Sequence, residues 1–255
     1  MKKSLRKANT SGPFVNEVVL RRDAVPSFDT YPFALPVVRA LDTLALHPHV
    51  TFLLGENGAG KSTLLEAIAV ALGLNAEGGS RNLRFQTRAS HSLLSDYLRL
   101  VRGSQRPLDS FFVRSETLYT LATALEDPAL GVLHHYGSQS LHERSRGEAL
   151  MALVTNRLGG GGLYLFDEPE AGLSPTRQLA FLAAMHQLVG RGSQLVLATH
   201  SPILLAYPDA CIYELADGAI VPRAYEDTEH YRITADFFAH RATMLKELLS
   251  DDESR

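Results

Sequence analysis

The sequence predicts an α/β protein in which a largely parallel sheet is flanked by helices. Three short apolar runs, within 50–54, 163–168 and 195–200, have the length and composition of buried strands. Helical patterns alternate with these runs, and that order is typical of a parallel sheet. The chain has 255 residues, 45% of them hydrophobic, which is enough for a sizeable core. We therefore expect one domain over residues 1–255.

The first part of the chain contains the first strand and helix of this pattern. Residues 14–22 have a strand-like composition, whereas residues 31–36 contain two prolines and fit only a loop or an edge segment. The apolar run 50–54 ends in a glycine-rich turn. The helical run 64–72 follows, and Gly73 ends it. We therefore expect a strand, a turn and a helix in direct succession.

The middle of the chain, at about 75–142, combines short strand-like pieces with helical ones. We expect an inserted, mostly helical lobe there. A four-glycine turn at 159–162 then leads into the next buried strand. The regular alternation of strands and helices resumes after this turn.

The last third of the chain continues with a helix whose ends the sequence marks clearly. Ser174 is the expected N-cap, Pro175 occupies the first helical position, and Gly190 lies beyond the end. The strand at 195–200 follows this helix. A hairpin around Asp217 and Gly218 and a C-terminal helix near 234–250 complete the prediction.

Composition excludes several classes of protein. The formal net charge of −3 gives no global basic field, so nucleic-acid binding is not indicated. No apolar run approaches the roughly 18 residues that a membrane span needs. The basic segment 1–12 has no apolar stretch behind it, and we interpret it as a solvated tail, with a docking patch for an acidic partner as the alternative. The single cysteine, Cys211, suits core filling and a reducing cytoplasm, so we expect a cytoplasmic protein.

The strongest motif is Gly55-x4-Gly60-Lys61-Ser62, the pattern of a phosphate-binding loop. Its glycines let successive backbone N–H groups turn toward phosphate oxygens, and the following helix adds its positive end. Lys61 supplies a positive charge for the β- and γ-phosphates, and the Ser62 hydroxyl is a ligand for Mg²⁺. The candidate ATP contacts are Gly55, Asn57, Gly58, Ala59, Gly60, Lys61, Ser62 and Thr63.

Two further strands end in polar residues. The strand L-Y-L-F ends in Asp167 and Glu168, and carboxylates at this end of a parallel strand lie at the edge of the sheet where ligands bind. We expect Asp167 to hold Mg²⁺ and Glu168 to polarise the attacking water. The strand 195–200 ends in His200, which we expect to reach the γ-phosphate.

With these motifs in this order, the sequence resembles the ABC-type ATPases of the P-loop NTPase superfamily. It resembles more closely the small stand-alone ATPases often described as AAA family. The resemblance covers most of residues 14–223 and rests on G-E-N-G-A-G-K-S-T, S-R-G-E, L-Y-L-F-D-E-P with A-G-L-S-P, and T-H-S. It implies an ABC ATPase-like fold with an N-terminal antiparallel β portion and a helical lobe, and ATP and Mg²⁺ as cofactors.

The resemblance also implies roles for individual residues. Asp167 is then the metal ligand, Glu168 the general base and His200 the histidine that responds to the γ-phosphate. The loop 171–174 would touch a second subunit. Lys61 would be part of the catalytic set.

Residues 145–148, S-R-G-E, correspond to the serine–glycine–glycine–glutamine sequence that ABC-type ATPases carry at a helix start. Ser145 and Gly147 match it, and Arg146 stands where the first glycine belongs. A serine N-cap with the helix amides behind it is a good anion site. In this family the segment serves the ATP of the partner subunit. Arg146 leaves two alternatives, because it would either bind the phosphate itself or widen the loop.

Two features of the family have no clear match. The glutamine that senses the γ-phosphate corresponds to Gln86 or to something near residues 114–116, and the spacing favours neither. The aromatic ring that stacks on adenine corresponds to Tyr31 or Phe33. A core or edge role is an equal alternative for each of these two rings.

We therefore predict an Mg²⁺-dependent ATPase that closes as a head-to-tail homodimer around two ATP molecules. The alternatives differ in what ATP hydrolysis serves. They are a slow ATP-gated dimer switch for an unknown protein partner, the ATPase subunit of a transporter, and the ATPase of a DNA-repair or recombination complex. A small-molecule kinase would share only the phosphate-binding loop.

Overall fold

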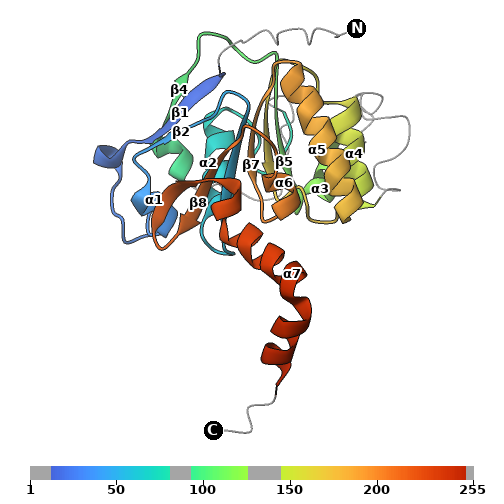
Figure 1. Cartoon of the computed structure of the whole chain (residues 1–255). Coiled ribbons are helices and arrows are strands. Elements are labelled where there is room, and N and C mark those ends of the chain that lie inside the picture. Colours follow the sequence, from blue (N-terminus) through green and yellow to red (C-terminus); the bar gives the residue numbers. More distant parts are fainter. Residues whose placement is uncertain (1–12, 81–92, 126–144, 251–255) are drawn as a thin grey trace, which may run out of the picture.

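A six-stranded sheet runs through the centre of the molecule (Figure 1). The computed structural model describes residues 13–80, 93–125 and 145–250. The strand order is β5-β6-β7-β3-β8-β9, and every neighbouring pair is parallel except β8 and β9. The strands are β3 (Val50–Gly55), β5 (Asp109–Arg114), β6 (Gly162–Asp167), β7 (Gln194–Ala198), β8 (Cys211–Ala216) and β9 (Ala219–Arg223). Every residue of β3, β6 and β7 is buried, as expected for a parallel sheet covered on both faces.

A second, smaller sheet is antiparallel and has the order β2-β1-β4. Its strands are β1 (Val15–Leu20), β2 (Thr43–Ala45) and β4 (Leu98–Arg102). The buried side chain of Gln194 joins the two sheets. Its Oε1 accepts hydrogen bonds from the backbone N–H groups of Phe14 and Val15, at 2.9 and 3.1 Å, and its Nε2 donates to the carbonyl of Val15 at 2.9 Å. The predicted N-terminal antiparallel portion is therefore present.

Helices cover both faces of the large sheet (Figure 1). On one face, α2 (Lys61–Ala71) lies between the two sheets, with α1 (Pro36–Ala40) beside it, and their apolar side chains form one core with β1 and β4. The opposite face packs against a second core. That core is covered by α3 (Leu118–Leu125), α4 (Arg146–Asn156), α5 (Pro175–Gly190) and α6 (Pro202–Leu205). Three short 3₁₀ turns complete the described elements: η1 (Arg22–Ala24), η2 (Leu93–Tyr97) and η4 (Tyr225–Asp227).

The last helix, α7 (Glu229–Leu249), projects away from the rest of the molecule (Figure 1). None of its residues is buried, and the backbone leaves helical geometry at His240, where φ is −122° and ψ is 27°. The side chain of Thr228 caps its N-terminus by accepting from the backbone N–H of Tyr231 at 3.4 Å. Within the described parts of the chain, no helix is both long enough and apolar enough to cross a membrane.

The prediction of a mostly helical lobe at about 75–142 was wrong for the described residues 98–114, which contain the strands β4 and β5. Residues 98–102 form β4, which pairs with β1, whereas residues 110–113 are a continuous buried run within β5. Within the described residues, helical structure on that side of the sheet begins at α3 and continues at α4. The basic tail at 1–12 lies outside the described residues.

Most other predicted elements are confirmed, with shifts at their ends. The hairpin turns at Asp217 and Gly218, whose φ values of 50° and 72° match a tight two-residue turn. Gly190 is the last residue of α5 rather than the residue beyond it, and Gly192, with a φ of 82°, follows the end of the helix. Helix α7 begins at Glu229, because Thr228 supplies an N-cap upstream of the predicted start.

Candidate active site

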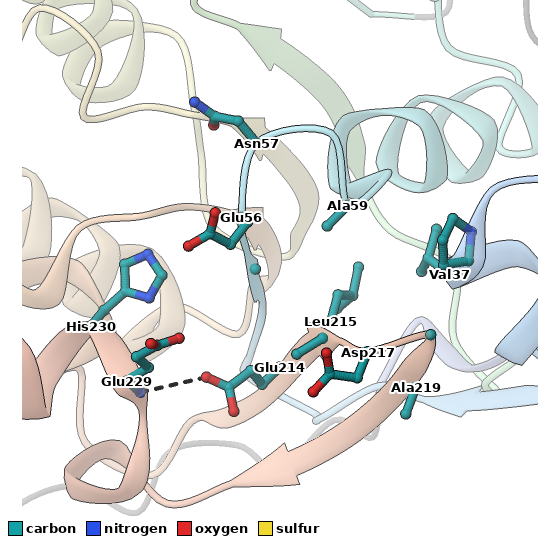
Figure 2. Close-up of a pocket in the computed structure, with 14 residues that line it drawn as sticks. Val37, Glu56, Asn57, Ala59, Glu214, Leu215, Asp217, Ala219, Glu229 and His230 are labelled. Atoms are coloured by element: carbon teal, nitrogen blue, oxygen red, sulfur yellow. Dashed lines mark hydrogen bonds between the residues drawn. The ribbon is translucent and has the colours of Figure 1, made fainter.

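The loop between β3 and α2 lies at the carboxyl edge of the six-stranded sheet (Figure 2). Gly55 ends β3 with a φ of 155°, and a Cβ there would lie 2.5 Å from the carbonyl oxygen of Leu215 on β8. Gly60 precedes α2 with a φ of 92°, and its Cβ would lie 2.5 Å from Cγ1 of Val37. Only glycine fits these two positions, so the loop passes closely between its neighbours and surrounds the N-terminus of α2.

A cleft of about 620 Å³ opens beside this loop (Figure 2). The loop, the start of α1, the turn of the β8–β9 hairpin and the first turn of α7 form its walls. Glu56 and Asn57 line it from the loop, and His230 lines it from α7. Its volume lies in the range of pockets for small molecules.

Lys61 and Ser62, the first two residues of α2, hold the loop to the sheet. The ammonium group of Lys61 donates to the carbonyls of Gly55 and Glu56, at 2.7 and 2.9 Å. Burial lowers the pKa of Lys61, while the nearby carboxylates, led by Glu168, act in the opposite direction. The hydroxyl of Ser62 donates to Oδ1 of Asp167 at 2.8 Å. The two motifs that lie 105 residues apart therefore meet directly.

Asp167 ends β6 and is 6% exposed. Its second oxygen, Oδ2, lies 3.5 Å from Nε of Arg114, whose Nη1 also contacts Glu66 at 2.6 Å. Burial raises the pKa of Asp167 to about 6, although the Ser62 hydroxyl and the Arg114 charge both lower it. The site therefore holds a buried carboxylate whose negative charge Ser62 and Arg114 stabilise only in part.

Glu168 follows Asp167 in an unusual backbone conformation, with a φ of 50°. Its backbone N–H donates to the carbonyl of Ala198 on β7 at 2.9 Å, and its carbonyl accepts from the hydroxyl of Ser115 at 2.6 Å. A left-handed conformation is uncommon for a residue with a side chain and is found most often at functional sites. These bonds fix the backbone, so the side chain, 38% exposed, lies at the edge of the sheet near His200.

His200 follows β7, and its backbone N–H donates to Oε1 of Glu170 at 2.6 Å. Its ring nitrogen Nε2 lies 3.6 Å from Oε1 of Glu168, and Nδ1 lies 3.4 Å from Nε2 of His230. Burial lowers the pKa of His200, and the charge of Lys61 lowers it further. Burial also raises the pKa of Glu170. His200 therefore links Glu168 and Glu170, which follow β6, to His230 in the first turn of α7.

The segment S-R-G-E starts α4 and packs against the loop 171–174. Ser145 and Glu148 form a capping box, in which Ser145 Oγ accepts from the Glu148 backbone N–H and the Glu148 carboxylate accepts from the Ser145 N–H at 2.9 Å. Arg177 donates to Ser145 Oγ at 3.2 Å and to Glu148 Oε1 at 2.9 Å. A Cβ on Gly147 would lie 2.6 Å from the carbonyl oxygen of Gly172, so glycine is needed for this contact.

The predicted site residues thus fall into two groups. One group lies together at the carboxyl ends of β3, β6 and β7: it consists of the loop Gly55, Asn57, Gly58, Ala59 and Gly60 with Lys61, Ser62, Thr63, Asp167, Glu168 and His200. The other group lies at the start of α4, where Ser145 accepts from Arg177 of α5 and Gly147 packs against Gly172.

The predictions for the adenine-stacking ring, the γ-phosphate sensor and Cys211 have different outcomes. Phe33 is buried and packs edge-to-face on Tyr97 with ring centroids 4.9 Å apart, so its role is in the core. Tyr31 is 68% exposed. Gln86 lies outside the described residues, whereas Ser115, within the alternative range 114–116, bonds to Glu168. Cys211 is only partly buried on β8, so the prediction that it fills the core was wrong.

Sequence reasoning missed the roles of Glu170 and His230 at this edge of the sheet, and it considered Arg114 only within the range 114–116. Arg114 contacts Asp167, Glu170 accepts from the His200 backbone, and His230 contacts the His200 ring. The apolar run before Arg114 was a usable signal, because a charged residue that ends a parallel strand lies at the ligand edge. No local pattern marks His230, since its place depends on how α7 starts.

Comparison with known proteins identifies similar ATP-binding proteins. A family model described as "AAA domain" matches residues 37–104, and one described as "AAA domain, putative AbiEii toxin, Type IV TA system" matches residues 118–206. The chain is 34% identical over 164 residues to the cytochrome c biogenesis ATP-binding export protein CcmA of Chelativorans sp. strain BNC1. That match covers 58% of this chain and 76% of the relative.

Two other similar proteins have transport in their names. A Bacillus thuringiensis subsp. konkukian protein named as an ABC transporter ATP-binding protein is 30% identical over 185 residues, which are 66% of this chain. The chain spans only 33% of that relative's length. The solved structure of CbiO1 from Clostridium perfringens, part of the ABC transporter complex CbiONQ, is 17% identical with a TM-score of 0.45, and the match covers 82% of this chain and 92% of that one.

Proposed function

The chain belongs to the ABC-type ATPases of the P-loop NTPase superfamily, and we propose that it hydrolyses ATP with Mg²⁺ in a head-to-tail homodimer. The observation that carries the proposal is the meeting of Ser62 with Asp167 at 2.8 Å, with Lys61 and Glu168 beside them. Phosphoryl transfer to water requires a loop that binds the phosphates, oxygen ligands for a metal ion and a group that positions the attacking water. The phosphate-binding loop, the oxygens of Ser62 and Asp167, and the carboxylate of Glu168 are candidates for these three parts.

The loop residues bind the phosphates. Nothing lies within 4 Å of the position of a Cβ on Gly58, so the loop has open space above its middle. Backbone N–H groups and the N-terminus of α2 are good donors to phosphate oxygens. Lys61 donates to two loop carbonyls. In the complex these bonds are exchanged for charge-assisted bonds to the β- and γ-phosphates.

Ser62 and Asp167 fit a magnesium ion. Both offer oxygen atoms, the ligands Mg²⁺ prefers, and Mg²⁺ usually takes only one or two protein carboxylates together with substrate phosphates. Burial raises the pKa of Asp167, so a nearby cation would stabilise the ionised form of this carboxylate. When bound, Mg²⁺ supplies positive charge that offsets the charge developing on the phosphate oxygens.

Glu168 is the general base of the proposed reaction. A carboxylate oxygen of Glu168 accepts a proton from the attacking water, and the positive φ of Glu168 keeps its side chain at the sheet edge. We expect His200, whose Nε2 lies 3.6 Å from Glu168 Oε1, to contact the γ-phosphate and the same water. The chain thereby provides one base and one neighbouring donor on adjacent strands.

The surface formed by residues 145–148 and 171–174 is the second half of the proposed site. Ser145 is exposed, and the α4 N-terminus behind it offers backbone donors to an anion. These residues do not contact the phosphate-binding loop of their own chain through any bond in the described structure. A second copy in head-to-tail orientation would present them to its partner's ATP.

The dimer is tested in a Glu168→Gln background, where ATP binds but is hydrolysed slowly. With ATP and Mg²⁺, the measured mass in solution should rise from monomer to dimer. Adding Ser145→Arg should abolish this rise, because a bulky cation then occupies the subunit contact. Ser145→Ala is the control, since it also removes the N-cap, at a cost of about 1 kcal/mol, but adds no bulk. A Ser145→Arg variant that still dimerises with ATP would refute the proposed interface.

The relatives named above favour a second candidate, in which ATP hydrolysis drives a membrane transporter. In that case the chain should co-sediment with membranes that contain its transporter partner, and the partner should accelerate ATP hydrolysis. An ATPase rate that membranes from the source cell leave unchanged would count against this candidate. The single cysteine agrees with a reducing compartment, and we place either activity in the cytoplasm.

A further inference from the structure

The first turn of α7 reaches the edge of the sheet where His200 lies. Nε2 of His230 lies 3.4 Å from Nδ1 of His200, and the ring centroids are 5.6 Å apart with planes tilted by 35°. Figure 2 shows His230 on the same side of the cleft as Glu56 of the phosphate-binding loop. The rest of α7 projects away from the molecule, so the first turn, which brings Glu229 and His230 to the cleft, is the part of this helix placed to influence the site.

The two rings share one hydrogen bond, so one nitrogen must donate and the other accept. In a neutral imidazole, only one of the two nitrogens carries a proton. If Nε2 of His230 donates, the proton of His200 lies on its Nε2. If Nδ1 of His200 donates instead, the Nε2 of His200 is a bare lone pair, and the proton of His230 lies on its Nδ1.

The surroundings of the rings favour the first arrangement. Nε2 of His200 is buried without a hydrogen-bond partner in the described structure, and the nearest acidic oxygen is Oε1 of Glu168 at 3.6 Å. A lone pair aimed at this carboxylate would be repelled, whereas an N–H is attracted. Each arrangement buries one ring N–H without a hydrogen-bond partner among the described residues, at Nε2 of His200 in the first and at Nδ1 of His230 in the second. Only the first places that N–H beside a carboxylate, that of Glu168.

We propose that His230 donates to Nδ1 of His200 and thereby holds the proton of His200 on Nε2, directed at the γ-phosphate. His230 is then a positioning residue that acts through His200. This inference rests on the proposed ATPase function and adds to it the group that sets the tautomer of His200. It also makes the start of α7 part of the hydrolytic machinery.

Steady-state ATP hydrolysis tests the proposal in two variants. His230→Phe keeps a ring but removes the donor, and it should lower kcat about tenfold, the equivalent of one hydrogen bond, while the KM for ATP changes little. His230→Gln carries a side-chain N–H near the position of the imidazole Nε2 and should restore most of the lost rate. His240→Phe is the matched control on the same helix, because His240 is exposed and remote from the cleft.

A double-variant measurement separates positioning from a general structural effect. If His230 acts through His200, adding His230→Phe to His200→Ala should cause no further loss of kcat. Equal losses in His230→Phe and His230→Gln, or additive losses in the double variant, would overturn the inference while the proposed function stands. An unaltered kcat in His230→Phe would do the same. A wild-type chain that releases no phosphate from ATP would overturn the proposed function itself and this inference with it.

Discussion

Asp167 and Glu148 each lie beside a serine hydroxyl and an arginine, but they differ in their exposure to solvent. Asp167 is buried at the end of β6, and burial raises its pKa to about 6. Glu148 lies on the exposed start of α4, where hydrogen bonds from Ser145 and then Arg177 lower its pKa to about 2. The carboxylate of Asp167 is shielded from water, whereas that of Glu148 is exposed and accepts hydrogen bonds from Ser145 and Arg177.

This contrast indicates what each region is built to meet. The region around Asp167 buries a carboxylate whose ionised form is unfavourable there, and such a group is suited to a cation that binds together with the substrate. The region around Glu148 uses its charged groups to fix the shape of an exposed helix start. A surface whose side chains are already held by internal hydrogen bonds is pre-organised for a partner, because it loses little conformational entropy when the partner binds.

Lys61→Ala should give the largest effect and tests the buried region. Removing the ammonium group should abolish measurable ATP turnover and weaken ATP binding, because no other described lysine lies in the loop. Phosphate release and calorimetric titration with ATP measure these two quantities. Lys246→Ala, on the exposed part of α7, is the matched control. A folded Lys61→Ala variant with normal turnover would contradict the site.

Glu168→Gln should give the next largest effect. The amide keeps the size of the side chain but cannot accept the proton of water, so kcat should fall about 10²-fold while ATP still binds. Single-turnover phosphate release measures the chemical step, and Glu226→Gln in η4 is the control. Unchanged turnover would assign the base to another group, with His200 the next candidate.

Gly147→Ala tests the exposed region by its packing. The added methyl would lie 2.6 Å from the carbonyl of Gly172, so the backbone must shift, and overpacking of this kind costs about 1–3 kcal/mol. Gly159→Ala is the control, because nothing lies within 4 Å of its Cβ position and its φ is not in the left-handed region. Urea unfolding of both variants measures the difference. Equal stability of the two would show that the α4 start does not depend on this contact.

The smallest expected effect is a pH dependence at Glu148. Its folded-state pKa of about 2 lies below the usual 4.5, so its contribution to stability is present above pH 4.5 and is lost as the pH falls toward 2. Glu148→Gln should therefore lower the urea midpoint at pH 6 and have a smaller effect near pH 3. A constant difference between the two proteins at both pH values would contradict this account.

The residues at the site that could be predicted from sequence belong to continuous local patterns. The glycine-rich loop, the acidic end of β6 and the serine cap of α4 each combine a strand or helix signal with polar residues next to it. Arg114 and His230 act through contacts with β6 and β7, which lie far away in the sequence. Such contacts depend on the strand order and on the path of α7, which a local pattern does not contain.

The limits of the helical lobe illustrate the same difficulty for the fold. Residues 98–102, L-R-L-V-R, also fit one turn of an amphipathic helix when read alone. Their partner is β1, some 80 residues earlier, and this antiparallel pairing decides the structure. Tertiary context of this kind overrides local preference. The predicted start of α7, near residue 234, also missed the N-cap at Thr228, although a threonine before a helix is a recognisable signal.

The projecting helix α7 has a mechanical consequence. Its 21 residues extend about 30 Å at the rise of an ordinary α-helix. None of these residues is buried, so the described body of the protein offers little resistance to a swing of the helix beyond its first turn. A rotation of about 10° at the histidine pair would then carry the far end through about 5 Å. The kink at His240 divides α7 into two helical segments. The stiffness of the backbone at this kink determines how much of the movement reaches Leu249.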